Sequence, residues 1–326
     1  MQTDNGGLIY ACILDGRGGG HPIDWERIHN WDATQGTLWV HLNFTADKTQ
    51  TWLRESSSLD EVVIEALLAD ETRPRSVAVK GGILASLRGI NSNPGADPED
   101  MVSIRLYSDG DRVITTRRRR LLSAQDISEA LAAGQGPCTA GGFIADISCR
   151  LVERMSDVLQ DIEDRIDQLE EEMLLNEGSQ QLRRQIVEIR SETILLRRYL
   201  GPQREAMNRL QSEKAEWLSP DDRLQLRETA DKVTRYVEDM DAVRDRAVVA
   251  SEELAHQVSE QMNSRMYILS LITGIFLPLG FLTGLLGINV GGIPGADKPW
   301  GFLAVIIVIT AIVAAQLLIF KRKKWF

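Results

Sequence analysis

Residues 266–290 read MYILSLITGIFLPLGFLTGLLGINV and residues 301–320 read GFLAVIIVITAIVAAQLLIF, and neither stretch contains a charged side chain. About 20 helical residues, each rising about 1.5 Å, cross the roughly 30 Å hydrocarbon core of a bilayer, and both stretches are long enough. The ten residues between them, 291–300, include Pro294 and Pro299 and predict a tight loop. The end of the chain therefore predicts a hairpin of two membrane-spanning helices.

The flanks of this hairpin predict its orientation. Residues 321–324, directly after the second stretch, read KRKK. By the positive-inside rule this basic tail, residues 321–326, stays in the cytoplasm, so both termini lie inside and the loop 291–300 faces the periplasm. Residues 1–8 show no basic region followed by an apolar run, so we expect no secretory signal.

The rest of the chain is polar and acidic. The 326 residues carry 47 acidic and 37 basic side chains, a formal net charge of −10. A nucleic-acid-binding surface needs excess positive charge to displace counterions, so nucleic acid is excluded as the main partner and cations are favoured. The three cysteines form no CxxC pair, which excludes a disulfide framework and a thiolate zinc knuckle.

Residues 1–141 predict a cytoplasmic α/β domain. Short β-prone runs alternate with helical stretches, and each run is bounded by Gly, Asn or Asp. We expect helix caps at Asp47, Asp60 and Ser123. The expected strands are 8–14, 37–44, 83–88, 102–107 and 112–116.

Residues 142–265 predict a cytoplasmic stalk of long helices, because strand patterns stop at Gly142. The expected helices are Phe143–Leu175, Ser179 to about Gln211, and Ser219–Leu286, the last running on into the first apolar stretch. This last helix carries a heptad seam, which should pack against neighbouring helices. The seam consists of Leu226, Val233, Met240, Ala247 and Leu254, interleaved with Ala230, Val237, Arg244, Ser251 and Val258.

A second stripe follows the same helix at alternating spacings of three and four residues. It is mostly acidic and polar before the membrane, and small or polar within it. Two interpretations remain open for the membrane part: a water-filled path, or a close-packed helix interface of small residues. The stripe consists of Glu228, Asp231, Arg235, Glu238, Ala242, Asp245, Val249, Glu252, His256, Ser259 and Asn263, then Met266, Ser270, Thr273, Leu277, Gly280 and Gly284. Two spans cannot enclose a pore, so transport would require several copies of the chain.

The end of the first apolar stretch resembles a known signature. Residues 276–289 read FLPLGFLTGLLGIN and are similar to the CorA metal-ion transporters, in which a Gly-Met-Asn triplet closes the first of two C-terminal spans. Here the triplet is Gly287-Ile288-Asn289, with Ile at the Met position. This variation, together with LDGRGG at 14–19 and ETRPR at 71–75, resembles the zinc-transporter branch called ZntB. The match also includes YLGPQR at 199–204.

This resemblance implies a homopentamer in the bacterial inner membrane, with a cytoplasmic funnel. The first span, 266–290, would line the pore, and the second, 301–320, would surround it. The positions that match the pore lining are Gly287, Ile288 and Asn289 at the mouth, then Gly284, Gly280, Leu277, Leu269 or Ser270, Met266 and Asn263, with Thr273 on the same stripe.

The chemistry of these positions predicts how an ion would pass. Five Asn289 carboxamides would present carbonyl dipoles at the entry, and the span contains no Asp, Glu, His or Cys to replace water ligands. We therefore expect the ion to pass largely hydrated. Leu277 and Met266 are candidates for apolar constrictions that gate by dewetting.

Ligands for zinc are scarcer. Glu252 and His256 stand one helical turn apart on the stripe, with Asp245 two turns before Glu252 on the same face, and such side chains can bind zinc. An ordinary surface salt link is the competing interpretation of this pair. His256 and Glu252 are also the groups that could carry a proton for a coupled carrier.

Three functions remain open. The favoured one is zinc uptake across the inner membrane by proton-coupled symport, with Zn²⁺ as transported ion and no bound cofactor. The second is zinc efflux, or channel-like permeation of Mg, Co, Ni or Cd ions. The third is a non-conducting, membrane-anchored sensor or scaffold that oligomerises through its helices. An enzyme is not expected, since no Walker lysine follows the glycine-rich residues 16–20.

Overall fold

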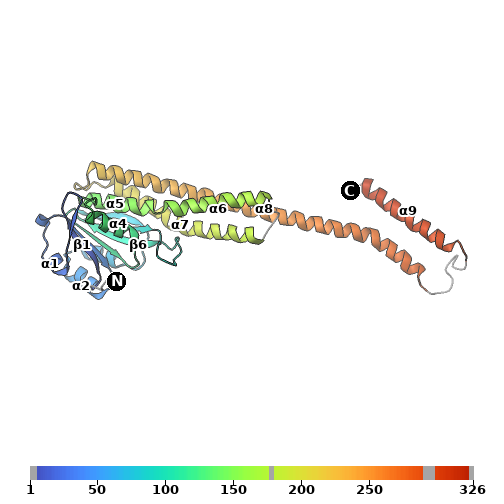
Figure 1. Ribbon diagram of the computed structural model, residues 1–326, viewed down its shortest axis with the longest axis horizontal. Coiled ribbons are helices and arrows are strands. Elements are labelled where there is room, and N and C mark those ends of the chain that lie inside the picture. The colour runs from blue at the N-terminus through green and yellow to red at the C-terminus, as the bar shows by residue number, and fades with distance from the viewer. Residues whose placement is uncertain (1–5, 176–179, 289–297, 323–326) are drawn as a thin grey trace. The chain divides into compact units, whose positions relative to one another are not determined.

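The computed structural model describes residues 6–175, 180–288 and 298–322 (Figure 1). Several predicted features lie outside the described residues: the helix break at 176–178, Asn289, most of the loop 291–300 and the end of the basic tail at 323–326. The chain divides into two compact units, residues 1–252 and 253–326. The division falls inside the predicted stalk 142–265, and each unit is described separately below.

A seven-stranded sheet forms the centre of the first unit, with the strand order β2-β1-β3-β7-β6-β5-β4 in the described residues. Only the β3–β7 pair is parallel within this sheet; the other neighbours are antiparallel. The strands are β1 (Leu8–Leu14), β2 (Gly20–Pro22), β3 (Leu38–Asn43), β4 (Arg75–Val79), β5 (Gly82–Gly89), β6 (Val102–Ser108) and β7 (Arg112–Arg117). The five predicted strands correspond to β1, β3, β5, β6 and β7, whereas β2 and β4 were not predicted.

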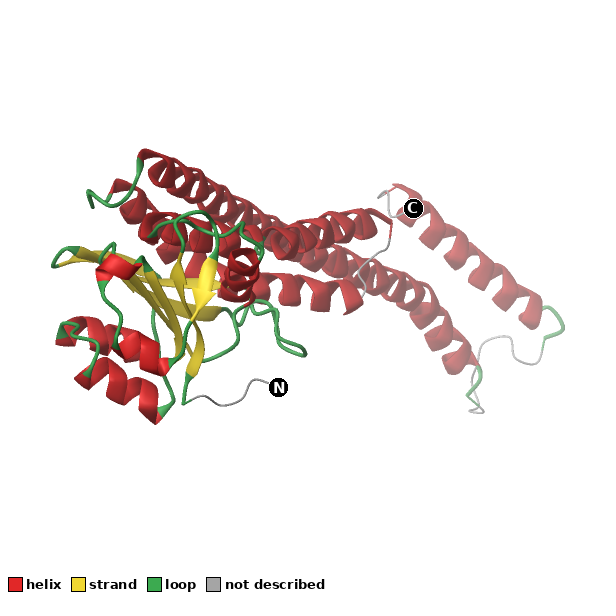
Figure 2. Cartoon of the chain, turned by 60° about the vertical axis from the view of Figure 1, so that its left-hand side comes forward, coloured by secondary structure: helices red, strands yellow, loops and turns green. Residues whose placement is uncertain are grey.

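Helices cover both faces of this sheet (Figure 2). One face packs on α1 (Trp25–His29), α2 (Asp47–Glu55) and α3 (Glu61–Leu68). The other face packs on α4 (Leu122–Ala132), α5 (Ala140–Glu153), and parts of α7 (Gln180–Ser212) and α8 (Pro220–Leu286). The remaining helices are α6 (Ser156–Leu175), α9 (Gly301–Arg322) and a short 3₁₀ turn at Ala33–Gln35.

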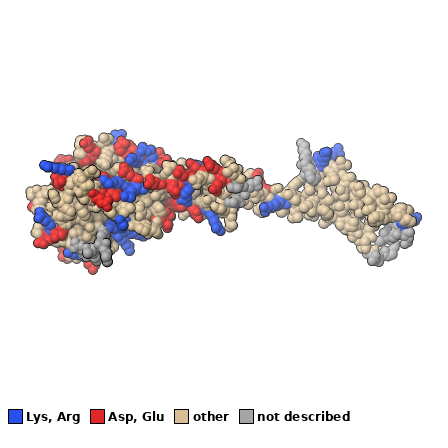
Figure 3. All heavy atoms as spheres, viewed as in Figure 1, with Lys and Arg blue, Asp and Glu red and all other residues tan. Residues whose placement is uncertain are grey.

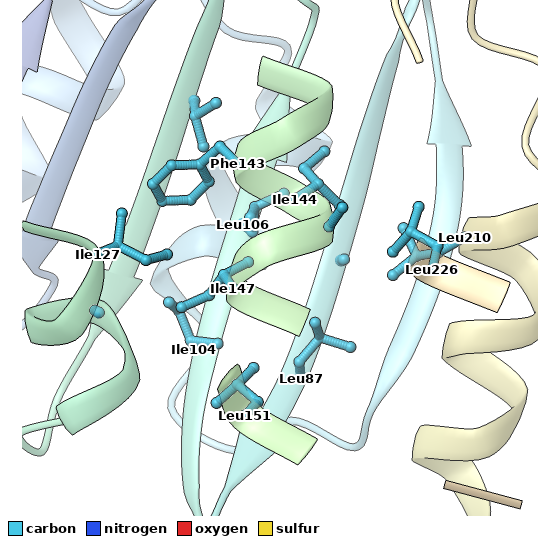
Figure 4. Close-up of a cluster of buried hydrophobic side chains, with 14 of the residues drawn as sticks. Leu87, Ile104, Leu106, Ile127, Phe143, Ile144, Ile147, Leu151, Leu210 and Leu226 are labelled. Atoms are coloured by element: carbon cyan, nitrogen blue, oxygen red, sulfur yellow. The ribbon is translucent and has the colours of Figure 1, made fainter. Parts of the chain in front are cut away.

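Strand alternation explains why this sheet has two cores. Successive side chains of a strand point to opposite faces, so Ile83 and Ala85 of β5 join one cluster while Leu84 joins the other. In the first cluster Phe143 and Ile147 of α5 lie over Ile104 and Leu106 of β6 (Figure 4). Leu210 of α7 and Leu226 of α8 close the same cluster, so the long helices are anchored directly on the sheet.

The predicted helix Phe143–Leu175 is wrong in its continuity, because a turn at Arg154 and Met155 separates α5 from α6. The Arg154 guanidinium binds the Asp126 carboxylate of α4 at 2.7 and 2.9 Å, and the Met155 side chain is fully buried. Both contacts are tertiary, so the local pattern could not indicate the break.

Two of the three predicted caps are also wrong. Asp47 and Ser123 lie inside the first turns of α2 and α4, whose capping residues are Ala46 and Leu121. Asp60 does cap α3, accepting a hydrogen bond from the Val62 amide.

The long helix α8 begins where expected, with a reciprocal cap. The Ser219 hydroxyl accepts from the Asp222 amide at 3.1 Å, the Asp222 carboxylate accepts from the Ser219 amide at 2.9 Å, and Pro220 occupies the first helical position. The first row of the predicted seam is confirmed: Leu226, Val233, Met240, Ala247 and Leu254 are all buried. In the second row Ala230 and Val237 are buried, whereas Arg244, Ser251 and Val258 are partly exposed.

Ion pairs tie the stalk helices together beside this seam. Arg165 of α6 binds Glu192 of α7 at 2.6 Å, and Arg246 of α8 binds Glu170 of α6 at 2.6 Å. A third pair joins Arg197 of α7 to Asp241 of α8. These pairs are partly exposed and so add modest stability each, but they fix which helix faces which.

The YLGPQR segment, residues 199–204, anchors α7 to the sheet. Strand β4 pairs with β5 up to Ser86, so the Arg88 backbone has no β4 partner. The fully buried Gln203 carboxamide takes that place: its oxygen accepts from the Arg88 amide at 2.8 Å and its nitrogen donates to the Arg88 carbonyl at 2.7 Å. The Tyr199 ring lies 4.0 Å from the Arg88 guanidinium carbon. A side chain therefore continues the strand pairing.

Replacing Gln203 with leucine should destabilise the protein by about 3 kcal/mol, because two buried backbone groups of Arg88 lose their partners. Thermal and urea unfolding of the purified full-length protein measure the loss. Gln181→Leu, an exposed position on the same helix, is the control and should change little. Equal stability of the Gln203→Leu and Gln181→Leu variants would contradict the anchoring role.

Candidate functional site

The second unit consists of the end of α8 and the helix α9. Both α8 and α9 contain windows long and apolar enough to cross a membrane. In Figure 3 this part of the surface is almost free of charged side chains, in contrast to the densely charged first unit. The described end of α9 carries Lys321 and Arg322, the first half of the predicted basic cluster.

Helix α9 packs on one side of the α8 span. The Gln316 side-chain amide of α9 donates to the Gly274 carbonyl of α8 at 3.2 Å. A β-carbon built on Gly274 would lie 3.5 Å from the Phe320 ring, an ordinary contact distance, so this position has room for alanine but not for a larger side chain directed at the ring. The partly covered positions of the span are Leu271, Ile275, Pro278, Leu279 and Leu282.

The predicted stripe lies on the other side of the same helix. Residues advance about 100° around a helix, which puts Thr273, Leu277, Gly280 and Gly284 roughly opposite the covered positions. All six stripe positions of the span, from Met266 to Gly284, are exposed, and a β-carbon on Gly280 or Gly284 would meet nothing within 4 Å. The stripe is therefore the face that α9 leaves uncovered.

On this face the Thr273 hydroxyl directs its hydrogen back into the helix rather than outward. Its hydroxyl donates to the Leu269 carbonyl at 2.8 Å, as helical threonines commonly do, which leaves oxygen lone pairs as acceptors. Ser270 and Asn263 are exposed on the same face. Such acceptors suit the hydration shell of a cation.

The helix ends at the signature triplet. Helix α8 stops at Leu286, and the Gly287 amide donates to the Thr283 carbonyl at 2.9 Å. A β-carbon on Gly287 would lie 3.0 Å from that carbonyl oxygen, so this position favours glycine. Ile288 is 47% exposed, and Asn289 lies outside the described residues.

The acidic stripe of the first unit is also exposed, from Glu228 to Glu252. Asp245 binds the neighbouring Arg244 at 2.8 Å. His256 approaches Glu260 at 3.9 Å through Nδ1. No group of three or more potential metal ligands occurs among the described residues, so Glu252, His256 and Asp245 form no such group within one chain.

Two other potential zinc ligands are committed elsewhere. The buried His41 contacts the Thr115 hydroxyl at 2.8 Å and accepts from Arg117 Nε at 3.1 Å, and burial together with the Arg117 charge lowers its pKa to about 3. Burial raises the pKa of Cys12 to about 12. A neutral, enclosed thiol is a poor metal ligand.

Comparison with known protein families matches residues 34–323 to the family described as CorA-like Mg2+ transporter protein. The chain belongs to the CorA family. A relative named divalent cation transporter CmaX, from Pseudomonas aeruginosa, is 40% identical over 324 residues, covering 99% of this chain and 98% of CmaX. The zinc transport protein ZntB of Pectobacterium carotovorum is 36% identical over 324 residues, with the same coverage. The predicted membership of the CorA family, in its ZntB branch, is confirmed.

Solved structures of CorA proteins share the whole architecture. Full-length CmaX superimposes with a TM-score of 0.87 at 39% identity, covering 100% of both chains. The CorA magnesium transporter from Methanocaldococcus jannaschii has the same fold, with a TM-score of 0.80 at 16% identity over 98% of this chain and 99% of that one. The predicted succession of an α/β domain, long helices and two apolar C-terminal helices is thus a CorA fold.

Enlarging Gly274 should loosen the contact between α8 and α9. Gly274→Leu would force the side chain into the Phe320 ring and should cost about 1–3 kcal/mol, whereas the alanine β-carbon fits at ordinary contact distance. Melting temperatures of the purified protein in detergent measure both variants. Equal melting of Gly274→Ala and Gly274→Leu would contradict this packing.

Proposed function

We propose that the chain carries zinc across the bacterial inner membrane by proton-coupled uptake, as a homopentamer with both termini in the cytoplasm. Family membership supports the coarse function, since CorA proteins of the CorA and ZntB types are divalent cation transporters. Zinc as the transported ion is supported by the ZntB relative and by the Ile288 variant of the triplet. The two apolar helices support a membrane location.

The observation that carries this proposal is the uncovered stripe of α8. A membrane helix that exposes glycine, serine and threonine along one face, opposite the face covered by its neighbour, presents hydroxyl oxygen lone pairs that hydrocarbon does not solvate. Several copies with this face turned inward would enclose a path that water can enter. The stripe therefore becomes the pore lining in an assembly of five.

The ion then crosses this path with most of its water. The lining from Asn263 to Gly284 offers hydroxyl, carboxamide and carbonyl oxygen but no fixed charge. Zinc held only through its hydration shell is not trapped, and Asn289 carboxamides at the mouth would attract it through their dipoles. Rings of Leu277 and Met266 would close the path when it loses water.

The stalk supplies the negative potential and the titratable groups. Exposed carboxylates along α8, from Glu228 to Glu252, attract cations to the inner mouth. Glu252 and His256 lie one helical turn apart, and copies of Asp245, Glu252 and His256 from five chains would form rings of zinc ligands. His256 is also suited to exchange the coupled proton.

Zinc flux into vesicles separates the open functions. Purified protein in liposomes with a trapped zinc indicator should admit zinc faster when the outside is acidic, since a tenfold proton gradient adds about 1.4 kcal/mol per co-transported proton. Zinc flux that ignores the proton gradient would favour channel-like permeation, and zinc leaving against an opposite gradient would favour efflux. Absence of any ion flux would overturn the transport proposal and favour the non-conducting sensor or scaffold.

In the same assay, Glu252→Ala combined with His256→Ala should reduce the proton dependence of zinc flux. Glu253→Ala is the matched control, because this exposed carboxylate lies beside the stripe on the same helix. Unchanged zinc binding and flux in the double variant would remove the pair from the mechanism.

Cysteine labelling tests the pore face independently. With Cys138 and Cys149 replaced by serine, Leu277→Cys and Gly280→Cys should react with a water-soluble, charged thiol reagent, because water reaches the pore. Ile275→Cys and Leu282→Cys, on the side covered by α9, should stay unreactive. Equal reactivity of the two pairs would contradict the assignment of the pore face.

A further inference from the structure

The first unit contains an arginine-lined pocket that transport does not require. Its volume is about 500 Å³, within the range of small-molecule sites in proteins. It lies where the segment before β4 meets β5, β6, the residues after β7, and α7. Six arginines line it, Arg73, Arg88, Arg105, Arg118, Arg119 and Arg198, against three carboxylates, Asp70, Glu71 and Asp100.

Arg105 gives this pocket a buried positive charge. The side chain is 1% exposed, and its guanidinium carbon lies 4.4 Å from the centre of the Phe44 ring. Nη2 donates to the Asp70 carbonyl at 2.8 Å, but Nε and Nη1 have no hydrogen-bond partner among the described residues. A buried guanidinium with no carboxylate bound to it is costly unless an anion compensates it.

Arg88 is positioned rigidly next to it. Nε and Nη2 donate to the Thr72 carbonyl, the latter at 2.9 Å, and Nη1 donates to the Met101 carbonyl at 2.6 Å. The Tyr199 ring stacks on the guanidinium, and Gln203 holds the Arg88 backbone. These Arg88 donors all bind neutral carbonyl groups, so the charge of Arg88 remains available to the pocket.

The other arginines differ in their partners. Arg118 binds Asp70 at 2.9 Å and Arg119 binds Asp100, so these two charges are balanced. Arg73 and Arg198 are exposed and have no carboxylate partner in the described part of the chain. The pocket therefore combines two buried or half-buried cations with two free surface cations, in a chain whose net charge is −10.

This composition favours an anion with several oxygen faces. A guanidinium binds a phosphate or carboxylate through two parallel N–H donors that contact a pair of oxygens. One carboxylate has a single pair of oxygens and so suits a single guanidinium in this geometry. A chain of two phosphates offers several faces in different directions, as arginines converging from separate elements require. The pocket volume also exceeds what a single phosphate would occupy.

We propose that this pocket binds a small diphosphate-bearing anion, either free pyrophosphate or the diphosphate of a nucleotide. Arg73 and Arg198 contact the outer oxygens, and Arg88 and Arg105 supply the potential beneath them. Because α7 contributes Arg198 and Tyr199 while β5 and β6 contribute the buried arginines, the bound anion joins the sheet to the stalk helix.

Calorimetric titration of the full-length protein in detergent with pyrophosphate tests this site. EDTA in the buffer keeps the probe free of divalent metal, so the result does not depend on zinc transport. We expect one site per chain, weakened about tenfold or more by Arg73→Gln and by Arg198→Gln, and further by both together. The affinity should also fall with added salt.

Arg75→Gln is the matched control, because Arg75 is an exposed arginine two residues from Arg73 and outside the pocket. Its affinity should stay within about twofold of the parent protein, since Arg75 does not line the pocket and would not contact the anion directly. Titration with ADP identifies the source: tighter binding than pyrophosphate indicates a nucleotide. Absence of pyrophosphate binding at millimolar concentration, or equal weakening by Arg73→Gln and Arg75→Gln, would overturn the proposal.

Discussion

The architecture depends on one constraint: hydrocarbon cannot hydrogen-bond a backbone or a polar side chain. Helices satisfy their own amides, which is why the uncharged stretches of α8 and α9 are helical throughout their described length. The same constraint applies to the serine, threonine and glycine face of α8. Helix α9 covers the opposite side, so the polar face needs either water or another copy of the chain. This uncovered face is the one that the proposed assembly turns toward its pore.

The first unit solves a different problem, that of holding a very long helix in register. The α5, α7 and α8 helices all bury leucines or isoleucines in the core on one face of the sheet. Ion pairs between the stalk helices then choose among rotations that the apolar seam alone would allow. Gln203 completes the attachment, because it extends the sheet's hydrogen bonding to a helix. A movement of the β5 backbone at Arg88 would therefore act on α7 through the two hydrogen bonds of Gln203.

Features encoded within one element could be predicted from the sequence. The seam and the stripe repeat at helical spacing along α8, so spacing alone predicted them. The two apolar spans are uncharged runs in α8 and α9, so composition alone predicted them. The edge strands β2 and β4 were missed because β2 has three residues and β4 mostly exposed side chains. At the break after α5, Arg154 pairs with Asp126, which lies 28 residues earlier, so the local pattern around the break does not reveal this contact. The arginine pocket could not be predicted because its six arginines come from five segments, with Arg118 and Arg119 adjacent, and only the folded sheet brings these segments together.

Gln316 has a consequence for how the chain enters the bilayer. It is the only carboxamide in residues 301–320, and the partner of its side-chain amide is a carbonyl of the preceding span. A carboxamide in hydrocarbon is costly unless it is hydrogen-bonded, so the second span is more stable in lipid when the first span lies beside it. This contact therefore favours insertion of the two segments together, as one hairpin.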